Sequence, residues 1–238
     1  YYLFEEMGVL DELKTRFVRK PGIRFTNADG TKSNTWCFKS VLEGPANLSF
    51  HVIRAEFDKV LLDNARKNGA TVFEETKVTA VNLKEPSGNV HLTTKSNGVE
   101  QNYSAKFLID ASGQNTFLSS RQRTKKPYKG LEKSAYLTHW TGGKYIKGIE
   151  EGLIQIVFLG GSKQGWLALQ PVAKDRLSIG IVLDTSYIKE QKTKFISQGE
   201  KDWTMALYLQ EVFSSSFMQD VLENAQIAQP LISISNYS

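Results

Sequence analysis

The chain has 238 residues, of which 40% are hydrophobic and 23% are charged, and its formal net charge is +5. This balance excludes a disordered chain, and the single cysteine, Cys37, excludes an intrachain disulfide framework and a cysteine metal cluster. No apolar segment approaches the roughly 20 residues of a membrane-spanning helix, and the scattered basic residues form no nucleic-acid recognition motif. We therefore expect a soluble, cytoplasmic protein with no bound metal, no nucleic-acid partner and no membrane span.

Helical and strand patterns alternate in the first quarter of the chain. Apolar residues recur at helical spacing in two segments, and a turn at 27–30 separates two strand patterns. Gly69 follows the second helical segment, where a left-handed residue closes a helix at little cost. The predicted elements are helix 1–13, strands Phe17 to Phe25 and Thr35 to Phe38, strand 49–53 and helix 54–68.

A β-meander is predicted next, with strands over 71–83, 90–94, 99–103 and 105–110 and a turn at 86–89. The last strand is an apolar run that ends in Asp110-Ala111-Ser112-Gly113. An acid at the carboxyl end of a buried strand, followed by a glycine, is typical of nucleotide sites in α/β sheets. An ordinary strand followed by a polar turn is the alternative interpretation.

The second half of the chain is predicted to form another β-rich group with helices after it. Strand patterns cover 134–141, 153–159, 164–170, 177–183 and 231–234, and 186–225 is mostly helical in pattern. The expected fold class is mixed α/β (α+β) with a large antiparallel component.

Three linked segments resemble the FAD-dependent monooxygenase superfamily with the hydroxybenzoate-hydroxylase-like fold, and within it the flavin-dependent halogenases. The segments are His51 to Asp58, Ala65 to Ala70 and Ile109 to Gly113. The resemblance implies a partial FAD-binding, Rossmann-like domain with a β-meander over 1–125, which carries an inserted hairpin from Phe17 to Phe38. It also implies an antiparallel-sheet and helical substrate domain over 126–230 and a return strand over 231–238.

The resemblance assigns cofactor contacts to three places. In relatives, the position of Arg54 faces the ribityl and phosphate region of the flavin, where a guanidinium adds fixed donors to a helix start. The position of Val78 lies beside the adenine, although a core valine accounts for the residue equally well. The turn that closes over the dinucleotide corresponds to Asp110, Ala111, Ser112 and Gly113.

Lys20 is the catalytic candidate. The stretch from Phe17 to Phe25 resembles the halogenase segment that brackets the catalytic lysine. A buried amine of lowered pKa can hold hypohalous acid. The implied reaction uses reduced FAD from a separate flavin reductase, a flavin C4a-hydroperoxide and a halide. Pro21 departs from the family pattern, and an ordinary surface lysine is the alternative.

Trp166 and Pro171 match part of the halogenase Trp-x-Trp-x-Ile-Pro signature. Ala168 replaces its second tryptophan and Gln170 its isoleucine. Trp166 and Pro171, together with His139 and Trp140, are the candidate substrate contacts; a sheet-core tryptophan and a structural histidine are the alternatives. The implied substrate is an electron-rich aromatic or pyrrole-like small molecule, free or carrier-bound.

Two motifs of the superfamily do not occur in this sequence: the Gly-x-Gly-x-x-Gly turn for the pyrophosphate and the later Gly-Asp segment. We therefore interpret the sequence as an internal fragment of a longer enzyme, inactive by itself. The alternatives are a hydroxylating monooxygenase or a reductase of the same superfamily, and a non-catalytic β-rich binding module.

Overall fold

The computed structural model describes residues 1–83, 88–126, 128, 130–160 and 163–235. The chain divides into two compact units, one made of Tyr1–Asn64 and Tyr128–Ser238 and the other of Ala65–Pro127. Part of the predicted turn at 86–89 and the last three residues of the predicted return strand lie outside the described residues. No helix within the described ranges is long and apolar enough to cross a membrane.

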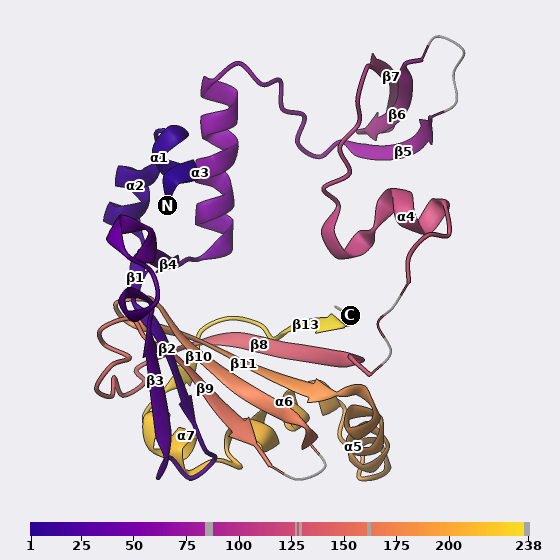
Figure 1. Ribbon diagram of the computed structural model, residues 1–238. Coiled ribbons are helices and arrows are strands. Elements are labelled where there is room, and N and C mark those ends of the chain that lie inside the picture. The colour runs from indigo at the N-terminus through magenta and orange to yellow at the C-terminus, as the bar shows by residue number, and fades with distance from the viewer. Residues whose placement is uncertain (84–87, 127, 129, 161–162, 236–238) are drawn as a thin grey trace. The chain divides into compact units, whose positions relative to one another are not determined.

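The first unit contains a large sheet with the strand order β12-β8-β11-β10-β9-β2-β3, and β13 also pairs with β8 (Figure 1). Its pairs are antiparallel except for β2 and β9, which run parallel. The mixed fold class with a large antiparallel sheet is thus confirmed. The strands are β2 Gly22–Thr26, β3 Ser33–Cys37, β8 Lys133–Thr141, β9 Ile154–Leu159, β10 Gly165–Ala173, β11 Arg176–Asp184, β12 Gln226–Ile227 and β13 Ile232–Ser235.

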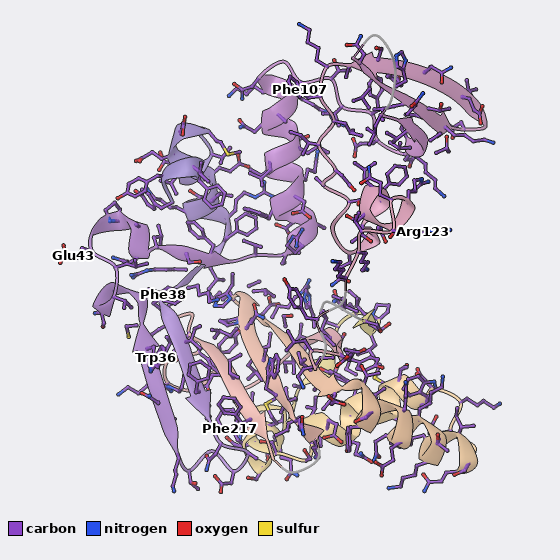
Figure 2. The ribbon with its side chains drawn as sticks, turned by 45° about the vertical axis from the view of Figure 1, so that its right-hand side comes forward. Trp36, Phe38, Glu43, Phe107, Arg123 and Phe217 are labelled. Carbon is purple, nitrogen blue, oxygen red and sulfur yellow. The ribbon has the colours of Figure 1, made fainter. Side chains whose placement is uncertain are left out.

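The hairpin β2–β3 belongs to this large sheet. It was predicted as an insertion in the 1–125 domain. In the structure Phe25 of β2 pairs with Ile156 of β9. Two contacts hold the tip of the hairpin: Gly30 lies against the ring of Phe217, which Figure 2 labels, and Ser215 donates to the carbonyl of Ala28. The division into cofactor-binding and substrate-binding domains remains a prediction.

Alternation along the central strands buries one face of the sheet. In β10 and β11 every second residue is apolar and fully buried, as at Leu167, Leu169, Ile179 and Ile181. This face packs against helices that follow β11 in the chain (Figure 1). The helices are α5 Thr185–Ser197, α6 Trp203–Val212 and α7 Ser216–Val221. The opposite face, called here the open face, carries partly exposed residues.

A second, smaller core lies among the N-terminal helices of the same unit. Val9, Leu13, Phe17 and Val60 are buried together, as the helical spacing of the sequence predicts. The elements are α1 Tyr2–Glu6, α2 Leu10–Arg16 and α3 Arg54–Lys67, with the two-stranded ribbon β1 Val18–Lys20 and β4 Ser49–His51 and the 3-10 turns η1 Phe38–Ser40 and η2 Gly44–Asn47.

Pro21 divides the predicted strand 17–25 into β1 and β2, which join different sheets. Proline has no backbone N–H and cannot donate to a continuing ladder. Its carbonyl oxygen accepts from the backbone N–H of Phe38 at 2.9 Å. Phe38 is thereby held beside the last residue of β1.

The second unit is a three-stranded antiparallel meander with a short helical segment. Its elements are β5 Lys77–Asn82, β6 Val90–Ser96, β7 Val99–Ala105, η3 Gly113–Asn115 and α4 Phe117–Arg121. The predicted meander is confirmed, but the predicted strand over 105–110 is wrong. Residues 106–112 form no strand, and Phe107 (labelled in Figure 2) and Ile109 are exposed to 86% and 88%. Within the described chain no strand pairs with this run, and an apolar run without a backbone partner does not become a strand. Residues 71–76 also lie outside β5.

The ribbon is fixed to the rest of the first unit at Gly152. This glycine has a φ of 91°, and a Cβ there would overlap the carbonyl oxygen of Arg19 in β1. Its own carbonyl oxygen lies 2.7 Å from Nε2 of His51 in β4. One glycine therefore touches both strands of the ribbon.

Replacing this glycine tests the contact. We expect Gly152→Ala to lower the free energy of unfolding by about 1–3 kcal/mol more than Gly199→Ala, because only the first adds a clash with buried backbone. Gly199 is a matched control with a φ of 80° and open space around its Cβ position, so its alanine variant carries only the strain of positive φ, about 1–2 kcal/mol. Equal losses in urea unfolding would contradict the close packing at Gly152.

Candidate functional site

Lys20 ends β1 in a half-buried position. Its Nζ lies 5.8 Å from the centre of the Phe38 ring, a cation–π distance when the amine is protonated. No ion pair to Lys20 is found among the described residues. Burial lowers the pKa of the Lys20 amine, because removing water disfavours its charged form. A larger fraction of the amine is therefore unprotonated at a given pH than for a solvated lysine.

His51 lies beside Lys20 on the ribbon and is 3% exposed. Because the Gly152 carbonyl oxygen can only accept, Nε2 carries the hydrogen and donates to it. The pKa of His51 is lowered, first by burial and then by the positive charge of Lys20, while the Gly152 carbonyl and the Gln170 side chain oppose the shift. Sequence analysis missed this residue as a site residue, although it begins one of the three segments that carry the family resemblance.

The Asp110 turn is built by its own carboxylate. Oδ1 accepts from the backbone N–H of Ser112 at 3.0 Å, and Oδ2 accepts from that of Leu118 at 2.8 Å. These bonds lower the pKa of Asp110, the Leu118 amide most strongly. Ser112 Oγ accepts from the N–H of Phe117, and Gly113 has a φ of 59°. Asp110 and Ser112 therefore shape the turn. The sequence alone could not distinguish this structural role from direct ligand binding.

This turn forms one wall of a cavity of about 620 Å³ in the second unit. Val78 of β5 lines the same cavity, so the structure brings Val78 together with Asp110, Ala111 and Ser112. Gly113 belongs to the turn but not to the cavity lining. Arg121 also lines the cavity and donates to the carbonyl oxygen of Thr79 at 3.3 Å. Arg121 begins the densest basic run of the sequence, 121–126, and such a short run is more often a solvated loop than a phosphate site.

Arg54 is the first residue of α3 and belongs to the other unit. Its guanidinium makes a bidentate pair with Asp58, with Nε–Oδ1 and Nη2–Oδ2 distances of 3.0 Å. The pair raises the pKa of Arg54, and the side chain is 77% exposed. A pair this exposed contributes little stability, so an anion can compete for the guanidinium.

The four predicted substrate contacts lie on two different faces of the large sheet. His139 and Trp166 are on the open face, whereas Trp140 and Pro171 face the helices. Trp140 is 4% exposed, and its Nε1 donates to the hydroxyl of Tyr208 at 2.8 Å, so it packs in the core. Burial, followed by the nearby charge of Arg176, lowers the pKa of His139.

The described part of the chain contains no cluster of three or more His, Cys, Asp or Glu residues that could hold a metal ion. On the β1–β4 ribbon, the titratable groups with shifted pKa values are the Lys20 amine and the His51 ring.

The fold is that of a flavin-dependent halogenase. The solved structure of CmlS, a flavin-dependent halogenase, matches with a TM-score of 0.83 and 25% identity over 98% of this chain and 40% of that chain. Flavin-dependent halogenase armH3 of Armillaria mellea is 30% identical over 75% of this chain, and a 1H-pyrrole-2-carbonyl peptidyl-carrier-protein chlorinase of Pseudomonas fluorescens is 31% identical over 49%.

The chain belongs to the tryptophan halogenase family, whose model matches residues 12–133. The resemblance stated from the sequence is thus confirmed. The matched range includes Lys20, Arg54, Val78 and the Asp110 turn. The chain spans 35% of the length of armH3 and 29% of the length of the chlorinase. None of these matches supports a binding module without catalytic function.

The carboxylate of Asp110 gives the turn a pH dependence. The pKa of Asp110 lies below the ordinary value of 3.8. The ionised carboxylate therefore holds the turn fully above pH 3.8, and its two hydrogen bonds weaken as the pH falls below that value. We expect the hydrogen-exchange protection of the Ser112 and Leu118 amides to fall in that range in the wild type, and Asp110→Asn to lower it at higher pH, where the wild-type carboxylate is ionised. Glu100→Gln, an exposed change in β7, is the control; unchanged protection in Asp110→Asn would contradict the arrangement.

Proposed function

We propose that the intact protein is an FAD-dependent halogenase that acts on an electron-rich aromatic or pyrrole-like substrate, free or carrier-bound. Chloride or bromide is the co-substrate, and a separate flavin reductase supplies reduced FAD. Family membership supports this proposal, and the observation that carries it is the half-buried Lys20 amine with a lowered pKa and no carboxylate partner among the described residues.

The residues of the second unit fit part of a dinucleotide. The 620 Å³ cavity lined by Val78 and the Asp110 turn has mainly apolar walls, as an adenine-sized group requires. Val78, Asp110, Ala111, Ser112 and Gly113 would hold this part of FAD. Arg54 would supply a donor for its ribityl and phosphate region. When bound, FAD supplies the oxidation of the halide by oxygen.

Lys20 would control the halogenating species. Hypohalous acid can donate its O–H to the unprotonated amine, which fixes the position of the halogen atom. The substrate carbon then forms a bond to the halogen and loses its proton, and the oxygen leaves as water. Trp166 and His139 on the open face are proposed substrate contacts. The core position of Trp140 accounts for that residue without a substrate, and Pro171 faces the same side.

A hydroxylating monooxygenase or a reductase is the second candidate. Ala168 and Gln170 depart from the halogenase signature, and both lie on the open face. A hydroxylase places oxygen rather than halogen on the substrate, so it has no use for a halide. The nature of the product therefore separates the two candidates.

Removal of the amine tests the proposed role of Lys20. We expect Lys20→Ala in the intact protein to lower halogenated product, measured by mass spectrometry with chloride or bromide, by at least about 10²-fold, because the amine contributes positioning at the reacting atom. Lys174→Ala changes an exposed lysine and is the control. Oxygenated product that forms without halide, at an unchanged rate in Lys20→Ala, would favour the hydroxylase instead.

Filling the cavity tests the cofactor assignment. Val78→Trp should weaken FAD binding by about 10-fold or more, equivalent to about 1.4 kcal/mol, because the indole occupies space proposed for the cofactor. Val99→Trp places the same side chain on β7 at an exposed position outside the cavity. Equilibrium dialysis against FAD measures both, and equal affinities would contradict the assignment.

A further inference from the structure

The register of the ribbon sets Lys20 and His51 side by side. Val18 pairs with His51 and Lys20 pairs with Ser49. Directly opposed residues in an antiparallel pair share a face, and diagonal neighbours on that face are within reach of long side chains. Lys20 and His51 are such a diagonal pair, with Ser49 facing Lys20 directly.

The His51 ring is held by Gly152 and lies near Gln170 of β10. Its Nε2–H donates to the carbonyl oxygen of Gly152 at 2.7 Å. The Gln170 side chain lies close enough to raise the pKa of this ring. Gln170 lies on β10, and this strand contacts both β1 and β4. The ring position is therefore set by two elements outside the ribbon.

Other charged groups around Lys20 point to solvent. The elements packed against it carry four exposed charged side chains, Arg19, Lys39, Glu150 and Glu151, and Arg19 lies on the other face of the ribbon. The lowered pKa of His51 leaves its ring uncharged where a lysine amine titrates. The ring therefore acts on Lys20 by excluding water and not by charge.

We propose that His51 and Gln170 are positioning residues for Lys20: Gln170 and the Gly152 carbonyl fix the imidazole, and the imidazole and the Phe38 ring confine the amine and keep water from it. This inference rests on the proposed function only for the use of the amine. The confinement itself is a property of the chain.

The departure from the halogenase signature at Gln170 has a physical meaning in this arrangement. An isoleucine at this position could not form a hydrogen bond with the His51 ring. The amide gives a buried histidine a second polar partner, which offsets the cost of burying the ring nitrogen. Gln170 should therefore act on Lys20 only through His51.

Competitive acetylation with acetic anhydride, read by peptide mass spectrometry across a pH series, measures the titration midpoint of Lys20 in the intact protein. Exposed Lys174 is the internal reference. We expect His51→Ala to raise the midpoint by about one pH unit, which lowers the unprotonated amine about 10-fold at a fixed pH below it. His51→Gln, which keeps a donor for the Gly152 carbonyl, should raise it less. His91→Gln, an exposed change in β6, should leave it unchanged.

Gln170→Ala tests the coupling. It should raise the midpoint in the wild-type background and have no further effect in the His51→Ala background. An unchanged midpoint in a folded His51→Ala protein, or an equal effect of Gln170→Ala in both backgrounds, would overturn the proposal. If circular dichroism shows that His51→Ala does not fold, unchanged midpoints in both His51→Gln and Gln170→Ala would overturn it equally.

Labelling measures the amine and not its use, so the two proposals can fail separately. If the Lys20 titration midpoints shift as expected but Lys20→Ala halogenates normally, the amine is confined by His51 and has no catalytic role. Unchanged midpoints together with lost halogenation by Lys20→Ala would show the reverse.

Discussion

The contact of Gly152 with the β1–β4 ribbon is the constraint on which the Lys20 region depends. A side chain at this position would collide with the backbone of β1, and the glycine's carbonyl oxygen accepts a hydrogen bond from β4. A two-stranded ribbon is marginally stable alone, and this one has three residues in each strand. Its geometry must therefore come from its neighbours, and the turn before β9 supplies it.

A half-buried lysine without a carboxylate partner is costly for a fold, because the charged amine loses hydration without a counter-ion. Because burial disfavours the charged form, the pKa of the amine is lowered and its neutral form is more accessible. The same feature makes the residue useful, since an unprotonated amine can accept a hydrogen bond from a reactive acid. The two cores of the first unit, one among the N-terminal helices and one between the large sheet and α5–α7, hold the fold together.

Local sequence patterns predicted the parts of the fold that depend on interactions between residues close in the sequence. The apolar spacing of α3, the positive φ of Gly69 and the alternation in β8 to β11 all appear in the structure. The apolar run at 106–110 was misread because a strand requires a partner, and hydrophobicity alone does not supply one. His51 was missed because its partners, Gly152 and Gln170, lie more than a hundred residues away in the sequence. Such contacts arise from sheet topology, which no local window contains.

Strand alternation also limits what sequence proximity can say about the substrate side. His139 and Trp140 are neighbours in the chain, yet successive side chains of a strand point to opposite faces. Trp140 reaches the core, where its Nε1 donates to the Tyr208 hydroxyl. His139 therefore reaches the open face. The same period puts Trp166, Ala168 and Gln170 on one face and leaves Pro171 on the other. Three positions of the half-matched signature thus form a single row of side chains on the open face, and Gln170, the last of the three, lies near the histidine beside Lys20. A change in this row can act on the chemistry through the position of the amine as well as through substrate contact.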